Sequence, residues 1–249
     1  MERNISTTPR DRRIALLVPA GGWATDDFER YWTREHGPLV ASTPDYALYR
    51  EAYVQDHILG AGPVGAAFPF AGIASVRMPL EPLDFASTPM FRERILPDEQ
   101  KFLDRRASVA FRTAEYRVGG RRDAVKVIVL SQRGAGQTPE TFREGVLTRY
   151  VDAVLAVPAV SGTLAGWTIN LVAAPPTDFE GNLDVDAAPV DVIEEYWFGS
   201  MEAMAASFTA RNTAEIAVVE EELFSPARSS FRSRELVYFE DGRPLPTPF

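Results

Sequence analysis

The hydrophobic positions of this chain change their period several times, and each change predicts a new structural element. Ile14–Val18 is a short apolar run followed by Pro19 and small residues, which is typical of a buried strand that ends in a turn. Between 25 and 36 the apolar side chains lie three and four residues apart, which predicts a helix that ends at Gly37-Pro38. Tyr46–Leu59 alternates with a period of two, as a half-buried strand does.

These patterns continue to residue 118 and then start again. A strand at 71–77, a helix between Pro82 and Asp104 that prolines interrupt, and a strand at 109–118 complete the first series. The second series has the same order: strand 125–130, a helix that begins at Thr138, strands 162–173 and 190–198, helix 200–224 and strand 231–240. Each series therefore reads β-α-β-β-α-β, the split βαβ order of ferredoxin-like domains.

A constant shift of 114 positions relates the two series, which indicates an internal duplication. The shift places Phe28 on Phe142, Pro44 on Pro158 and Tyr53 on Trp167. We expect one repeat over 13–118 and a second, degenerate repeat over 125–240. Each sheet alone would leave an apolar face in water, so we predict an α+β fold in which the two repeats pack sheet to sheet as one body.

The two repeats differ in the residues that could carry chemistry. At the same shift His36 falls on Tyr150 and His57 on Leu171, so both histidines of the chain lie in the first repeat. The second repeat is therefore expected to support the fold and the first to hold the site. Glu194 and Glu195 could line a second site, although one of this pair is equally well explained as facing solvent.

Composition removes several classes of function. A net charge of −9 would repel a nucleic acid backbone. No apolar run is long enough to cross a bilayer, and the first residues are polar, so we expect a cytoplasmic protein without a membrane partner. The chain has no cysteine, which excludes disulfides, thiolate nucleophiles and thiolate metal ligands. A metal would need His36, His57 and a carboxylate to converge, and we predict neither a metal site nor a cofactor.

The segment Phe28–Val40, with the sequence FERYWTREHGPLV, resembles the F-x-x-Y-W-x-x-x-H-G-P-L signature of the EthD family. The following strand, YVQDHI at Tyr53–Ile58, and the sequence FLD at Phe102–Asp104 are also similar to that family. The family belongs to the dimeric α+β barrel superfamily, in which two chains pair through their sheets. The resemblance therefore implies a fused barrel within this one chain and leaves open a homodimer of such fused barrels.

His36 is the first candidate for catalysis. It lies one turn after Trp32 and two turns after Phe28, at the end of the apolar stripe of the predicted helix. Histidine changes its charge near neutral pH, which suits a residue that transfers protons. The alternative is a structural histidine that packs on Trp32 and holds the Gly37-Pro38 turn.

A polar strand face is the second candidate feature. Tyr49, Glu51, Tyr53, Gln55 and His57 should share one face of the strand Tyr46–Leu59, whereas the matching face of the second repeat is almost entirely apolar. Polar groups in a covered position must be paired or face a wet cavity. We therefore predict a pocket between helix 25–36 and strand 46–58, with a solvent-exposed strand face as the alternative.

The members of the family that this chain resembles include dehydratases, lactone isomerases and polyketide cyclases without cofactors. The resemblance, together with the histidines, leads us to expect a cofactor-independent lyase or isomerase. Its substrate would be a hydrophobic aromatic or polyketide-like small molecule. The alternatives are a cofactor-free oxygenase of a phenolic substrate and a non-catalytic module that binds a hydrophobic metabolite.

Eight residues are assigned to this predicted site. The catalytic candidates are His36, Tyr49 and His57, and the candidates for substrate binding are Phe28, Trp32, Glu51, Tyr53 and Gln55.

Overall fold

The computed structural model describes residues 5–6, 8–66, 70–81, 83–182 and 190–246. The elements of the first half are β1 (Arg10–Leu17), α1 (Thr25–Tyr31), η1 (Trp32–His36), α2 (Gly37–Ala41), η2 (Tyr46–Leu48), β2 (Ala52–Ala61), β3 (Gly72–Arg77), η3 (Phe91–Ile95), α3 (Leu96–Phe102) and β4 (Val109–Gly120). Here η1 and η3 are π-helical turns, and η2 is a turn of 3₁₀ helix.

The second half repeats this order with additions. Its elements are β5 (Val125–Arg133), α4 (Pro139–Gly145), the π-helical turn η4 (Val146–Tyr150), α5 (Val151–Ala156), α6 (Pro158–Ser161), β6 (Leu164–Val172), β7 (Thr177–Asp178), β8 (Val192–Phe198), α7 (Met201–Ala210), α8 (Ala214–Leu223), β9 (Phe224–Glu240) and β10 (Arg243–Pro244). None of the helices in the described part of the chain combines the length and apolar character needed to span a bilayer.

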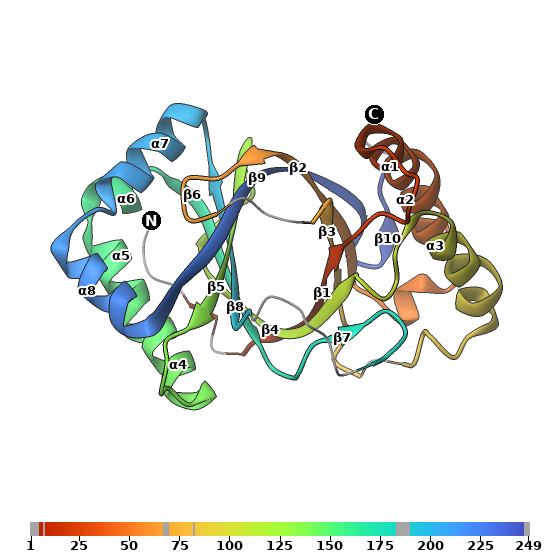
Figure 1. The fold of residues 1–249 in the computed structure, drawn as a ribbon, viewed down its shortest axis with the longest axis horizontal. Helices are drawn as coiled ribbons and strands as arrows, with labels where there is room; N and C mark the ends of the chain where they lie inside the picture. Colours follow the sequence, from red (N-terminus) through yellow and green to blue (C-terminus); the bar gives the residue numbers. More distant parts are fainter. Residues whose placement is uncertain (1–4, 7, 67–69, 82, 183–189, 247–249) are drawn as a thin grey trace.

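The strands form one antiparallel sheet that closes on itself. Its order is β1-β3-β2-β9-β5-β8-β6-β4, and β4 pairs back to β1. Helices α1–α3 cover one side of this barrel and α4–α8 cover the opposite side (Figure 1). The fold is therefore an α+β fold built on a closed antiparallel barrel. The four strands of the first half face those of the second half across the barrel. The two halves are also joined at both edges, β2 to β9 and β4 to β6. This closure leaves no open edge between the halves.

The elements of the two halves follow the same order. Strand order is β4-β1-β3-β2 in the first half and β9-β5-β8-β6 in the second, so each strand occupies the equivalent place in its half. Helices α1 and α4 start at Thr25 and Pro139, which differ by the predicted 114 positions. The π-helical turns η1 and η4 that follow them differ by the same number. Between the two predicted repeats, β4 continues past residue 118 through Gly119 and Gly120.

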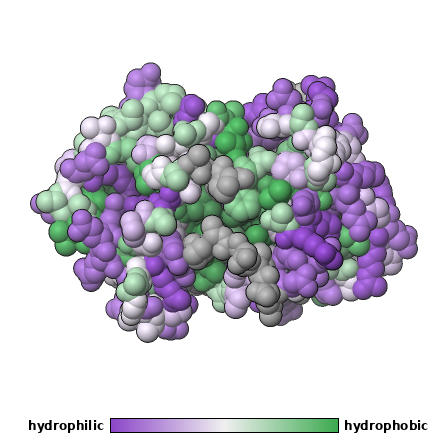
Figure 2. All heavy atoms as spheres, viewed as in Figure 1, coloured by the Kyte–Doolittle hydropathy of each residue, from purple (hydrophilic) through white to green (hydrophobic). Residues whose placement is uncertain are grey.

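The core has separate layers on the two sides of the sheet. Inside the barrel, Ile14 and Leu16 of β1 meet Ile128 and Leu130 of β5, so this layer is shared by both halves. Outside, the helices of each half pack mainly on the strands of that half. Tyr238 of β9 also packs with residues of the first half, and Val118 of β4 belongs to the core of the second. Figure 2, viewed as Figure 1, shows apolar side chains over the middle of the face, where the strands lie.

Two predicted boundaries in the first half are wrong. The helix does not end at Gly37-Pro38 but continues through α2 to Ala41. Proline lacks an N–H, and the carbonyl of Thr33, five residues earlier, instead accepts a hydrogen bond of 2.7 Å from the Tyr238 hydroxyl. The strand predicted from residue 46 begins only at Ala52, because η2 forms a turn of helix before it.

Gly37 generates a prediction, because a side chain there would enter occupied space. An added Cβ would overlap Cε1 of the Tyr238 ring, although the Gly37 φ of −57° is ordinary for a helix. Gly37→Ala should therefore lower the free energy of unfolding by about 1–3 kcal/mol, the usual cost of overpacking. Urea denaturation measures this change.

The control is Gly21→Ala, where an added Cβ meets nothing within 4 Å. Helix propensity alone would make Gly37→Ala stabilising by about 1 kcal/mol. A gain in stability from Gly37→Ala would therefore show that Tyr238 does not close this side of the helix.

Candidate functional site

His36 lies at the C-terminal end of η1 and is held by a carboxylate from the second helical segment. Its Nδ1 is 2.9 Å from Oδ2 of Asp98 in α3, and both side chains are only 7% exposed. No hydrogen bond to the other ring nitrogen, Nε2, is present among the described residues. The aromatic rings of Phe102 and Tyr53 lie 5.0 and 6.5 Å from the imidazole.

Asp98 is the centre of a small polar cluster. Its second oxygen accepts hydrogen bonds from the Tyr31 hydroxyl and from the ammonium group of Lys101. Burial alone would raise the pKa of Asp98, but the hydrogen bonds from His36 and Tyr31 outweigh it and lower the pKa to about 2. Asp98 is therefore an anion at neutral pH, and an anion beside Nδ1 favours the tautomer with hydrogen on Nδ1.

Three residues of the predicted polar row form a second, adjoining network. Tyr53, Gln55 and His57 share the face of β2 that the helices cover, and each is at most 3% exposed. The amide nitrogen of Gln55 donates to the Trp32 carbonyl at 3.0 Å and to the Tyr53 hydroxyl at 2.8 Å. This orientation turns the amide oxygen of Gln55 toward Nε2 of His57, 3.0 Å away.

The Gln55 amide fixes the protonation state of His57. An amide oxygen only accepts hydrogen bonds, so Nε2 of His57 must carry the hydrogen. Its Nδ1 is buried and has no hydrogen-bond partner in the described part of the chain. Burial and the nearby charge of Arg234 lower the pKa of His57 to about 3. His57 is therefore neutral at physiological pH and donates a hydrogen bond to Gln55.

Two side chains from the barrel strands also support the π-helical turn that carries His36. Gln55 and Tyr238 donate to the carbonyls of Trp32 and Thr33, both within η1. π-helical turns often occur at functional sites. The equivalent turn η4 in the second half shows, however, that this turn is part of the repeated fold and is not by itself a sign of function.

Phe28 and Trp32, two residues predicted to line a pocket between helix 25–36 and strand 46–58, are closely packed. Phe28 and Trp32 are at most 1% exposed and pack on each other, and the Trp32 ring lies 4.4 Å from that of His57. Tyr49 and Glu51 precede β2 and are not in the polar row. Tyr49 packs on Phe85, whereas Glu51 pairs with Arg10 at 3.8 Å.

The second half contains a buried polar network that the sequence did not predict. Tyr150, at the position of His36, is fully buried with Trp167 and Ile169, as expected. Its hydroxyl, however, accepts from Arg211 and lies 3.3 Å from that of Tyr196. The phenol of Tyr196 in turn donates to Glu194.

Neither glutamate of the Glu194-Glu195 pair faces solvent, which corrects that alternative. Both are at most 2% exposed, and they lie on opposite faces of β8. Glu194 faces the helices and lies 3.6 Å from Arg228, whereas Glu195 points into the barrel. Burial raises the pKa of Glu194, while Arg12 and Lys126 overcome burial and lower the pKa of Glu195.

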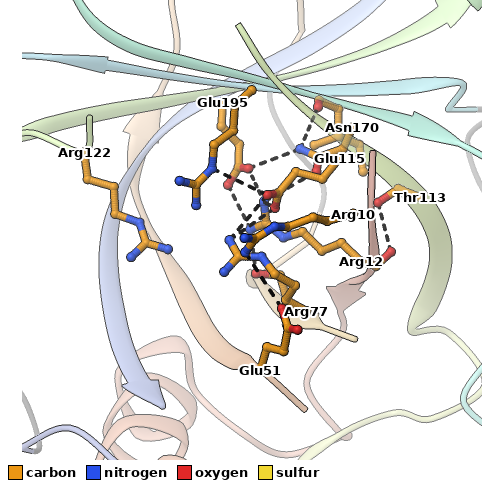
Figure 3. A network of polar contacts seen from close by, with 12 residues as sticks. Arg10, Arg12, Glu51, Arg77, Thr113, Glu115, Arg122, Asn170 and Glu195 are labelled. Carbon is orange, nitrogen blue, oxygen red and sulfur yellow. Dashed lines mark hydrogen bonds and ion pairs between the residues drawn. The ribbon is translucent and has the colours of Figure 1, made fainter. Parts of the chain in front are cut away.

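One end of the barrel interior is charged, which the sequence analysis missed. Arg12 on β1 forms ion pairs with Glu115 and with Glu195, and so connects strands of both halves. Its second guanidinium nitrogen donates to Ser75 at 2.7 Å. Figure 3 shows Arg10, Arg12 and Arg77 gathered around Glu115 between the walls of the barrel.

A neighbouring cluster has the form of a metal site but already holds a cation. Oxygens of Asp56, Glu195 and Glu235 lie within 4.8 Å of one another. Nζ of Lys126 lies between them, at 2.9, 2.7 and 2.5 Å. Burial, together with the two glutamates, raises the pKa of Asp56 to about 6 even though Lys126 opposes the shift.

Residues 20–106 match the family model described as the EthD domain. The chain is therefore similar to the EthD family over these residues. No curated protein has a sequence that matches this chain.

Solved structures resemble the whole chain. One is a "putative monooxygenase" from Lactobacillus acidophilus NCFM, 9% identical, which covers 96% of this chain and 98% of its own with a TM-score of 0.51. A variant of chlorite dismutase from Candidatus Nitrospira defluvii is 11% identical, covers 92% of each chain and has a TM-score of 0.46. At these identities the first structure supports the fold alone.

Asp98, within the residues that match the EthD model, is a functional candidate that could not be identified from the sequence pattern. The sequence did hold one indication that Asp98 is buried, because it lies four residues before the buried Phe102 and so shares its helix face. A single carboxylate at such a position is not distinctive. Its approach to His36, 62 positions away in the chain, depends on the packing of α3 against η1.

The protonation state of His57 can be tested through the pH dependence of the free energy of unfolding. Its folded pKa of about 3 is below the ordinary value of 6.5, so the unfolded chain binds this proton more readily. His57 therefore contributes stability that is complete above pH 6.5 and is lost as the pH falls toward 3, with a slope of up to about 1.4 kcal/mol per pH unit. His57→Gln should flatten the stability curve over this range.

Proton NMR of the imidazole rings checks the same point. Two histidine signals are expected, and the one missing from His57→Gln should not shift between pH 8 and pH 5. The His36→Gln variant assigns the other signal. A His57 signal that titrates with a midpoint near 6.5 would contradict the buried hydrogen bond between His57 and Gln55.

Proposed function

We propose that this protein is a small-molecule enzyme in which His36 transfers a proton and Asp98 holds its ring. The observation that carries the proposal is the 2.9 Å contact between His36 Nδ1 and Asp98 Oδ2, with Nε2 of the same ring unpaired among the described residues. With hydrogen on Nδ1, the lone pair of Nε2 is available as a base. The anionic Asp98 stabilises the imidazolium ion that forms when Nε2 accepts a proton.

The favoured reaction is a cofactor-independent lyase or isomerase step, such as dehydration, cyclisation or lactone rearrangement. His36 would remove a proton from a carbon beside a carbonyl and return it to another atom of the substrate. The aromatic rings of Phe102 and Tyr53 near His36 favour a hydrophobic aromatic or polyketide-like substrate. Because His36 is only 6% exposed, the substrate reaches Nε2 only if covering side chains move.

The predicted residues take revised roles in this proposal. Tyr53, Gln55 and His57 position the turn that carries His36, and they do so from behind the helix. Trp32 and Phe28 form the apolar support of this turn. Tyr49 keeps a place in substrate binding through its half-buried ring beside Phe85, whereas Glu51 is assigned to the end of the barrel.

We also propose that 13–118 and 125–240 are two ferredoxin-like repeats, of which the second is degenerate. The matching strand orders β4-β1-β3-β2 and β9-β5-β8-β6 support this division. The buried Tyr150 at the position of His36 supports placing the reaction in the first repeat.

A cofactor-free oxygenase acting on a phenol is the second candidate. The same base would deprotonate the phenol, and the resulting phenolate is the electron-rich species that reacts with oxygen. The similarity to a structure named as a monooxygenase favours it. Oxygen consumption during turnover separates this reaction from a lyase or isomerase step, which proceeds equally well without oxygen. A module that only binds its ligand would show no turnover in either condition.

Three variants test the catalytic assignment on a panel of phenolic and polyketide-like lactone substrates, with products identified by mass spectrometry. His36→Gln keeps the size of the side chain but cannot titrate, so kcat should fall by about 10²-fold or more while the fold persists. Asp98→Asn should lower kcat and move the acidic limb of the pH–rate profile to lower pH, because the imidazolium loses its anionic partner.

Tyr150→Phe is the control at the equivalent position of the second half, and it should leave the rate per folded molecule unchanged. Equal losses of rate from Tyr150→Phe and His36→Gln would overturn the assignment of the site to the first half. Unchanged kcat in His36→Gln would show that His36 is structural.

A further inference from the structure

The charged end of the barrel contains a cavity that the proposed reaction does not use. Its volume is about 510 Å³, and both halves contribute to its walls. Arg77 of β3 lies on one wall and Trp197 of β8 on the other. The charged residues that line the cavity are Arg10, Arg12, Arg77, Arg117, Arg121, Arg122, Glu115, Glu195, Glu235, Glu240 and Asp241.

The cations on one wall have too few anionic partners. Glu115 is the carboxylate shared by Arg12, Arg77 and Arg117, and the shortest contacts are 3.3, 3.4 and 3.7 Å. A well-made charge-assisted hydrogen bond is about 2.7–2.9 Å long, so all three contacts are stretched. Arg12 is also paired with Glu195, whereas Arg77 and Arg117 have Glu115 as their only carboxylate partner among the described residues. These two guanidinium groups retain capacity for another anion.

Two buried donors on the cavity walls have no acceptor. Nε of Arg77 and Nε1 of Trp197 are both buried and without a hydrogen-bond partner in the described part of the chain. Arg77 is 5% exposed and Trp197 6% exposed. A buried donor without an acceptor is unfavourable because it has lost its hydrogen bonds to water, so an acceptor between these walls would stabilise both groups.

The segment between the halves adds two more cations. Arg121 and Arg122 follow Gly120, whose φ of +78° and close approach to the Ala165 carbonyl exclude a side chain. Arg122 pairs with Glu235 and Glu240, whereas Arg121 has no ion pair among the described residues. The linker thus places an uncompensated guanidinium at the cavity.

We propose that this cavity binds a small organic anion through a carboxylate or phosphate group. The oxygens of that group accept from Arg77 Nε and Trp197 Nε1, and the guanidinium groups around Glu115 supply the balancing charge. Arginine favours such oxyanions because its planar donors match their geometry. The ring of Trp197 provides an apolar surface for the organic part of the ligand.

The electrostatics of Arg77 agree with this arrangement. Burial lowers the pKa of Arg77, and the neighbouring cations Arg12, Arg117 and Arg10 lower it further, although Glu115 opposes them. A bound anion would relieve this repulsion. The site is independent of the proposed reaction, because His36 does not line the cavity.

Isothermal titration calorimetry of the full chain tests the proposal, with inorganic phosphate and succinate as probes and chloride at matched ionic strength as the reference. We expect one site per chain for phosphate or succinate and none for chloride. The stronger of the two probes identifies phosphate or carboxylate as the group that is bound.

Three variants then locate the site. Arg77→Met should weaken binding about tenfold or more, since it removes a charge-assisted hydrogen bond. Trp197→Phe keeps the ring but removes the N–H, and it should weaken binding severalfold. The matched control is Arg112→Met, which removes one positive charge from β4 at a 67% exposed side chain paired with Asp11. It should leave binding unchanged.

The outcomes separate the alternatives. Absence of binding above the chloride reference means that the cavity holds water only, and it overturns the proposal. Equal weakening by Arg77→Met and Arg112→Met means a general effect of charge and overturns it as well. If Arg77→Met does not fold, Trp197→Phe decides, because it leaves every ion pair in place.

Discussion

Closure of the sheet is the constraint on which the rest of this structure depends. Once β1 pairs with β4 and β2 pairs with β9, one face of every barrel strand is confined to a single interior. Charged residues on that face can be kept only if they pair across the barrel, because an unpaired buried charge is very costly. Lys126, with three carboxylates around its ammonium group, shows how this requirement is met.

The alternation of strand residues then divides two kinds of chemistry between the faces of one strand. On β2, Asp56 points inward to Lys126, whereas Gln55 and His57 point outward to the helix that carries His36. A shift of one residue would exchange these faces and place His57 in the charged interior. The strand thus contacts both the barrel interior and the His36 region, and its backbone separates the charged groups of the interior from the residues near His36.

The two halves keep the same framework and fill it differently. The π-helical turns η1 and η4 occupy equivalent positions, and the residue at the end of each is His36 or Tyr150. In the first half the residue faces a carboxylate from α3, and in the second it faces Arg211 and Glu220. Both sites are buried and polar. The two halves therefore share a backbone arrangement while their polar partners differ, since each buried group needs only some satisfied arrangement.

Local patterns determined much of this protein. The period of the apolar positions predicted most helices and strands. The 114-residue shift predicted the matching order of elements in the two halves, and the motif around His36 indicated the similarity to the EthD family. The apolar period and the motif depend on residues that are close together in the sequence, and the shift is found by comparing one part of the sequence with another. Helix continuation past Gly37-Pro38 was not visible, because it depends on a hydroxyl from Tyr238 that lies 205 positions from Thr33.

Tertiary structure decided how the polar residues are used. Whether Gln55 and His57 line a pocket or satisfy each other depends on how closely Trp32 packs on them, and Asp98 meets His36 only through the packing of two helices. The charged interior depends on closure, because Arg12 and Glu195 are 183 positions apart. A sequence pattern specifies which face of a strand is polar, but the partner across the barrel is specified only when the sheet closes.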